Sequence, residues 1–176
     1  MHFTEPKAPG EAASPGHACT RIWQALGNVS RLEFTARSLT GTTGWNGEGR
    51  GRVEVSAEND HTLVFRETGK WNPELDSGNA GSGHRELDFS NTYRWTLHDP
   101  HRGISLSHLR YGRQNPVHLA ELVHDRQNRH LLKSAAPHRC NLDRYTLDLC
   151  ADGEGLTLRW KIEGPAKNEH LVYRYR

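Results

Sequence analysis

Residues 156–176 have the sequence LTLRWKIEGPAKNEHLVYRYR, in which apolar and polar residues alternate on both sides of a turn. Alternation with a period of two is typical of β-strands that bury one face. Gly164-Pro165 supplies the turn, so the pattern predicts an antiparallel hairpin. On its second strand Tyr173 and Tyr175 share the apolar face, and we expect them to point inward while the arginines between them point outward.

The same alternation recurs through most of the chain and predicts a mostly β protein. The apolar positions that mark the strands are Leu32 and Phe34, Val53 and Val55, Leu63 and Phe65, residues 87–97, Ile104 and Leu106, residues 117–123 and residues 143–149. The turn-rich spacers between them are residues 41–49, 57–61 and 99–103. Sequences that form helical crossovers are lacking between the strands, which disfavours a parallel sheet.

One short segment, Cys19–Leu26, has a helical pattern, with Ile22, Trp23 and Leu26 on one face and Gly27 as a stop. We expect this helix to close one end of a barrel. Before it, residues 1–18 are rich in proline and glycine and are expected to form a flexible tail. A second such stretch, residues 72–85, is expected to be a loop inserted between strands.

Eight or more consecutive antiparallel strands in one small domain can form a closed barrel or a two-sheet sandwich. The order of one helix followed by hairpin-connected strands favours an up-and-down β-barrel, in which closure removes exposed strand edges. We therefore predict a single barrel domain over residues 19–176, with a β-sandwich as the alternative. A chain of 176 residues is long enough for one such core.

The amino-acid composition restricts the classes of molecule that the protein is expected to bind. With 23 Lys and Arg against 21 Asp and Glu, the net charge of +2 is far from that of a dedicated nucleic-acid-binding protein. The first 19 residues hold no apolar run, so we expect no secretory signal and no membrane span. Cys19, Cys140 and Cys150 have no zinc-finger spacing, and we expect a cytoplasmic protein without a structural disulfide.

Several positions together resemble an uncharacterised family, classed as a domain of unknown function, whose members are similar in outline to calycins and lipocalins. The resembling residues are Glu67, Gly69, Tyr93-Arg94-Trp95, Val117-His118, His138, Cys140, Asp143, Tyr145, Trp160, Gly164-Pro165, Lys167 and Tyr175-Arg176. They span about residues 23–176. The resemblance implies a barrel fold and does not imply a reaction.

The chain departs from the lipocalin pattern at Gly27-Asn28-Val29, where lipocalin-like chains carry Gly-x-Trp. The tryptophan that usually covers the barrel floor is therefore missing. Trp23, in the preceding helix, is one replacement for it, and a differently packed floor is the other.

A polar cluster at His138, Cys140, Asp143 and Tyr145 is the candidate site. Asp143 and Tyr145 share a face with Leu147 and Leu149 of the strand that follows, so Asp143 is expected to point inward near a barrel mouth. The groups could orient a small polar molecule, or they could be structural, with Asp143 capping a loop and Tyr145 plugging the barrel. Two further hypotheses are a zinc site that recruits His118 and a Cys140 nucleophile activated by His138.

We predict that the barrel binds a small, partly apolar ligand in its lumen. The residues expected to bind it are His118, His138, Asp143 and Tyr145, with Trp95, Trp160 and Tyr173 as walls. An enzyme that uses the cluster in acid-base or metal-assisted chemistry and a protein-interaction module are the alternatives. The sequence indicates no cofactor, ligand identity or oligomeric state.

Overall fold

The computed structural model describes residues 15–40, 46–74, 86–128 and 130–176. One helix and eleven strands make up this part of the chain: α1 (Pro15–Gly27), β1 (Arg31–Ser38), β2 (Gly47–Asn59), β3 (Thr62–Pro73), β4 (Leu87–Asp99), β5 (Gly103–His108), β6 (Val117–His124), β7 (Leu131–Ser134), β8 (His138–Cys140), β9 (Asp143–Asp152), β10 (Gly155–Gly164) and β11 (Lys167–Tyr175).

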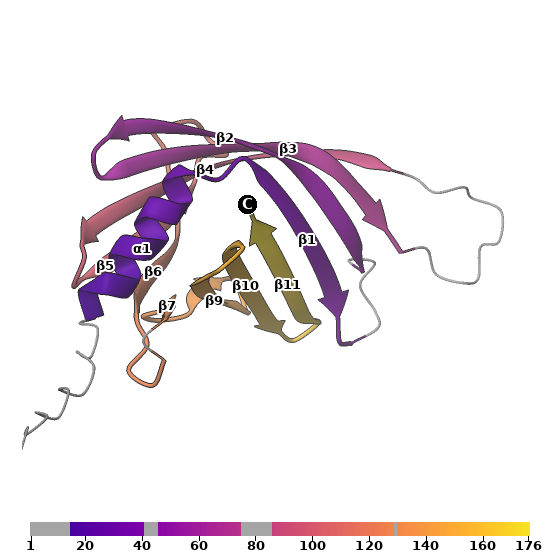
Figure 1. Cartoon of the computed structure of the whole chain (residues 1–176). Helices are drawn as coiled ribbons and strands as arrows, with labels where there is room; N and C mark the ends of the chain where they lie inside the picture. The colour runs from indigo at the N-terminus through magenta and orange to yellow at the C-terminus, as the bar shows by residue number, and fades with distance from the viewer. Residues whose placement is uncertain (1–14, 41–45, 75–85, 129) are drawn as a thin grey trace, which may run out of the picture.

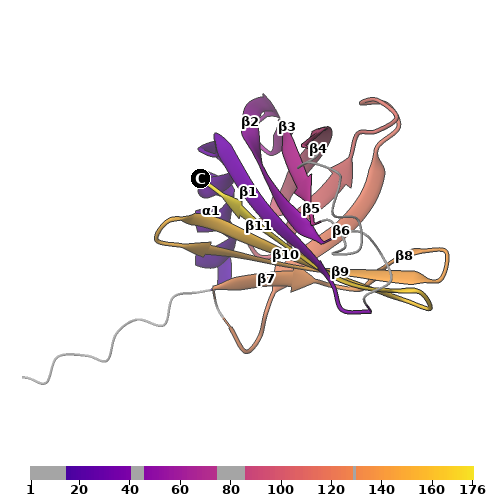
Figure 2. The same ribbon diagram turned by 90° about the vertical axis from the view of Figure 1, so that its right-hand side faces the viewer.

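Ten of the strands form a closed antiparallel barrel (Figures 1 and 2). Neighbours in sequence are neighbours in space from β1 to β7, then β7 pairs with β9 and β9 with β10. The pairing of β1 with β11 closes the ring. The short β8 pairs with the first part of β9, at the end of the barrel beyond β7. The predicted up-and-down barrel is confirmed, and the sandwich alternative is wrong.

The C-terminal hairpin lies as its alternation predicts. Leu158 of β10 is paired with Tyr173 of β11, and Leu156 with Tyr175. Tyr175 is buried in the core with both leucines, whereas Arg174 is exposed on the outer surface. Inward-facing side chains of the whole barrel form one hydrophobic cluster.

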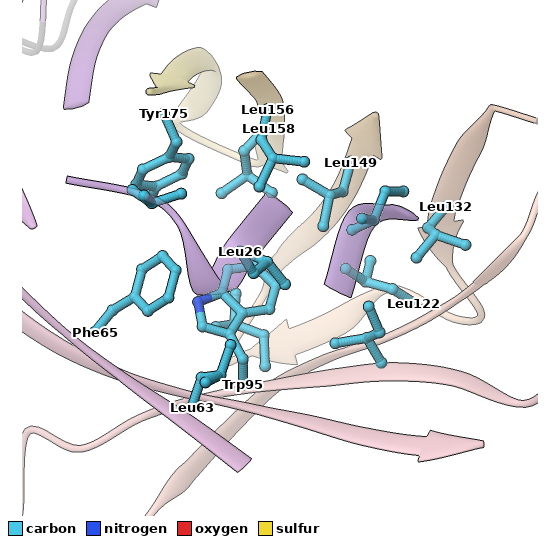
Figure 3. Packing of buried hydrophobic residues seen from close by; sticks show 14 of the residues in the cluster. Leu26, Leu63, Phe65, Trp95, Leu122, Leu132, Leu149, Leu156, Leu158 and Tyr175 are labelled. Atoms are coloured by element: carbon cyan, nitrogen blue, oxygen red, sulfur yellow. The ribbon is translucent and has the colours of Figure 1, made fainter. Parts of the chain in front are cut away.

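The helix closes one end of the barrel. Cys19, Ile22 and Leu26 are almost fully buried in the core, and Leu26 lies among leucines of β6, β7, β9 and β10 (Figure 3). Helix α1 ends at Gly27, as predicted, but it begins at Pro15 and not at Cys19, so part of the expected tail is helical. Trp23 packs against the core but is only partly buried, whereas Ile22 and Leu26 of α1 are almost fully buried there.

Other boundaries also differ from the predicted ones. Strand β2 includes residues 47–49 and 57–59, which were expected in spacers, because its pairing with β3 continues at both ends. Strands β7 and β8 were not predicted, because four and three residues are too few to show an alternating pattern. The expected loop at 72–85 overlaps the end of β3, and residues 75–85 lie outside the described part of the chain.

Aromatic rings fill the lumen beside β1, β2 and β3. The Phe34 ring is stacked between Trp71 (ring centroids 5.2 Å apart) and Tyr173 (5.0 Å). Phe34 faces Gly49 across the β1–β2 pair, and a Cβ atom at Gly49 would overlap the ring. The Phe34 ring can therefore occupy this position only because Gly49 has no side chain.

The helix in the described part of the chain is too short and too polar to span a membrane.

We predict that Gly49→Ala lowers the free energy of unfolding by about 1–3 kcal/mol, because the added methyl group forces the stacked Phe34 ring to move. The matched control is Gly153→Ala, since a Cβ atom there would meet nothing within 4 Å. Chemical denaturation monitored by circular dichroism measures both variants. Equal stabilities of the two variants would contradict the role given to Gly49.

Candidate functional site

The barrel is hollow at the end opposite α1. A cavity of about 290 Å³ opens there, between β4, β5 and β6 on one side and β8, β9, β10 and β11 on the other. Its apolar walls are formed by Val117, Leu119, Trp160, Ile162 and Leu171. Its polar lining is formed by Tyr93, His108, Arg110, His138, Cys140, Tyr145 and Tyr173.

A larger hollow of about 450 Å³ lies on the outer surface, over β1, β2 and β11. Its lining includes the exposed charged residues Glu33, Glu48, Arg50 and Arg174. Water solvates such side chains well, so this hollow offers a ligand little apolar surface to cover. The cavity in the lumen is the better candidate because its lining is mainly apolar and aromatic.

Four of the seven predicted ligand-binding residues line the cavity: His138, Tyr145, Trp160 and Tyr173. Trp95 lies deeper, fully buried beside a void of about 10 Å³ under the cavity floor. Trp160 and Tyr173 thus face the lumen. Whether these residues bind a ligand stays a prediction.

The other two predicted residues do not reach the cavity. His118 is exposed, while its neighbours Val117 and Leu119 line the lumen, so alternation turns the imidazole outward. Asp143 lies at the mouth, where its carboxylate forms an ion pair with Lys167 (Nζ to Oδ2 2.8 Å). This pair ties the start of β9 to the start of β11.

The sequence cluster is only partly a spatial cluster. Because β8 pairs with β9, His138 and Cys140 are in extended backbone and line the same cavity, with the His138 ring 5.9 Å from that of Tyr145. Among the described residues, no side-chain hydrogen bond joins His138, Cys140 and Asp143 to one another, and no group of three His, Cys, Asp or Glu side chains is placed to hold a metal. The structure therefore places His138 and Cys140 in one cavity but leaves Asp143 and His118, which the zinc hypothesis also needs, outside its lining.

A buried carboxyl group lies in the lumen at Glu67. The side chain is fully buried, and the hydroxyl group of Tyr175 donates a hydrogen bond to Oε1 (2.7 Å). Burial raises the pKa of Glu67 from its ordinary value of 4.5 to about 7, although Tyr175 and Asn91 partly offset the shift. No described donor makes a hydrogen bond of normal geometry to the other oxygen, Oε2.

Two further tyrosines connect this carboxyl group to the cavity. Burial raises the pKa of Tyr93 and of Tyr173, and the nearby Glu67 adds to both shifts. Both rings line the cavity, so their hydroxyl groups stay protonated and can donate or accept hydrogen bonds near its floor. Glu67 and the three tyrosines form a polar centre next to the apolar core of the barrel.

Sequence reasoning missed Glu67, His108 and Arg110 as members of the site. The signal for Glu67 was present: it follows Leu63 and Phe65 at a spacing of two, which places its carboxyl group on the buried face. His108 likewise continues the buried face of Ile104 and Leu106. Arg110 lies beyond the end of β5, where alternation no longer predicts direction.

A model of a family of unknown function, DUF6314, matches residues 31–176. The chain belongs to this family. The match covers all eleven strands of the DUF6314 barrel and leaves α1 outside it. The closed barrel is consistent with the calycin-like outline inferred from the sequence. No curated protein and no solved structure matches the chain.

We predict that the stability of the wild-type protein falls relative to that of Glu67→Gln as pH rises from 5 to 8. Between about 4.5 and 7 the folded state holds a proton on Glu67 that the unfolded state releases, so this contribution is lost with rising pH. The isosteric amide cannot ionise, and the two stabilities should diverge by up to roughly 3 kcal/mol. Urea denaturation at several pH values measures this difference, and parallel pH profiles would contradict the raised pKa.

Proposed function

We propose that the barrel binds a small, partly apolar molecule at its open end. The cavity of about 290 Å³ carries this proposal, because it is close to the lower limit of roughly 300 Å³ for typical ligand pockets. Its lining combines apolar walls with a few polar groups, the arrangement that holds a ligand and fixes its orientation.

The cavity walls supply apolar surface that water would otherwise cover. Trp160, Ile162 and Leu171 face the lumen and are only partly buried. A ligand that fills this space removes that surface from water, at a gain of about 25 cal/mol for each Å² covered. The hydrophobic effect thus favours a ligand whose apolar part packs against these three side chains.

The end of the barrel at which the cavity opens also presents exposed apolar side chains. The large hydrophobic residues that are exposed in the described part of the chain are Leu39, Leu87, Tyr111 and Leu142. Each lies at the barrel end where β1, β5 and β8 finish and β4 begins. Their position suits the entry of a poorly water-soluble ligand.

The alternatives have less support. An enzyme acting through His138, Cys140 and Asp143 would need contacts between these groups, and Asp143 is instead paired with Lys167. An interaction module would be favoured by a lumen filled with side chains, whereas the open end here is hollow. We infer a reducing, cytoplasmic setting from the three free thiols, one of which, Cys140, is exposed.

We predict that Val117→Trp prevents binding of prodan, a neutral fluorophore whose emission shifts to shorter wavelength in apolar surroundings. Val117 lines the cavity, and an indole there would occupy the space. The matched control is His118→Trp, which adds the same indole to the outer face. Titration should show a saturable shift for wild type and for the control, with thermal melts showing that both variants fold.

Equal prodan binding by Val117→Trp and wild type would place the fluorophore outside the lumen and contradict the proposed function. So would a wild-type protein that binds no prodan at all.

A further inference from the structure

The ionisable groups that line the cavity are bases or hydrogen-bond donors. Arg110, His108 and His138 lie around the mouth, and among the described residues no aspartate or glutamate lines the cavity. We propose that the ligand carries a carboxylate, which Arg110 binds at the mouth together with His108 and His138. This inference rests on the proposed function and adds the chemical class of the ligand.

Arg110 is available for such a contact. It follows the buried Leu109 just after β5 and is exposed at the rim, where its guanidinium lies 4.9 Å from the centre of the Tyr111 ring. Within the described residues it takes part in no salt bridge, in contrast to Arg113, which is paired with Glu58. Its planar set of N–H donors matches the two oxygens of a carboxylate.

His108 is the second donor of the mouth. Its ring is stacked on that of Tyr93, with centroids 4.9 Å apart, which fixes its position in the wall. Burial and the charge of Arg110 lower the pKa of His108, so the two side chains are close enough to oppose a second positive charge. A carboxylate between them removes this repulsion and accepts a hydrogen bond from each.

The carboxylates of Asp143, Glu67 and Glu169 are nearby, but they do not occupy the position proposed for the carboxylate of the ligand. Asp143 is neutralised by Lys167, and Glu67 lies beneath the floor with Tyr175 as its donor. Glu169 points inward on β11 but is buried and does not line the cavity. In the part of the chain that the structure describes, the donors of Arg110, His108 and His138 therefore face a space that no carboxylate lines.

The apolar walls define the other half of the ligand. Leu119, Trp160 and Leu171 line the same cavity as the three basic groups. A compact aromatic or short aliphatic acid places its body against these walls and its carboxylate at the mouth, where the charge keeps contact with water. A long alkyl chain does not suit the volume of about 290 Å³.

The test compares three probes with one naphthalene body: 2-naphthoate, 2-naphthamide and 2-naphthylmethylammonium. Isothermal titration calorimetry at low salt, which limits screening of the exposed Arg110, measures each dissociation constant. We expect 2-naphthoate to bind about tenfold or more tightly than the amide, and the cation to bind most weakly.

The variant Arg110→Gln should remove most of the preference for 2-naphthoate while the amide binds as before. Arg139→Gln is the matched control, because it makes the same change of charge on β8 at an exposed residue that does not line the cavity. Circular dichroism melts show that both variants fold.

Equal affinities of wild type for the three probes, or a preference for the cation, would overturn the carboxylate assignment and leave the proposed lumen binding in place. A preference that Arg110→Gln and Arg139→Gln reduce equally would also overturn it, since general surface charge would then explain it. Binding of none of the probes, together with no binding of prodan, would overturn both.

Discussion

The packing of the Phe34 ring against the backbone of Gly49 determines where this barrel is open. The ring needs the space that a side chain at Gly49 would fill, and it lies between Trp71 and Tyr173 in a stack. These rings fill the lumen beside β1, β2 and β3, and α1 fills one end. Free volume therefore remains on the opposite side and at the opposite end, which is where the cavity lies.

The fold followed from the sequence wherever alternation was long and regular. The hairpin of residues 156–176 showed its strands, its turn and its inward tyrosines, because each strand has one apolar face. Strand β8 did not, since three residues after Pro137 are too few for a period to be seen. The start of β2 was hidden for a different reason: Gly47 and Gly49 resemble turn residues, yet they lie in the strand, where a side chain would meet the Asn72 backbone at Gly47 and the Phe34 ring at Gly49.

The site could be predicted only in part, because nearness in sequence was taken for nearness in space. His138 and Tyr145 do meet across the β8–β9 pair, but Asp143 is held by Lys167. Glu67 is far from this cluster in sequence and comes close to Tyr175 only when the barrel closes. Its inward direction was visible from alternation, whereas its partner depends on the register across β1, β2 and β3, which a single sequence does not show.

A ligand held in the lumen is the central claim, and native mass spectrometry of the protein purified from its own cells tests it most directly. We expect the wild-type protein to carry an added mass of a small organic acid, released on unfolding. The same preparation of Val117→Trp should carry the mass of the chain alone, because the indole fills the cavity. Wild-type protein that carries only the mass of its chain, or an added mass retained by both proteins, would contradict a ligand in the lumen.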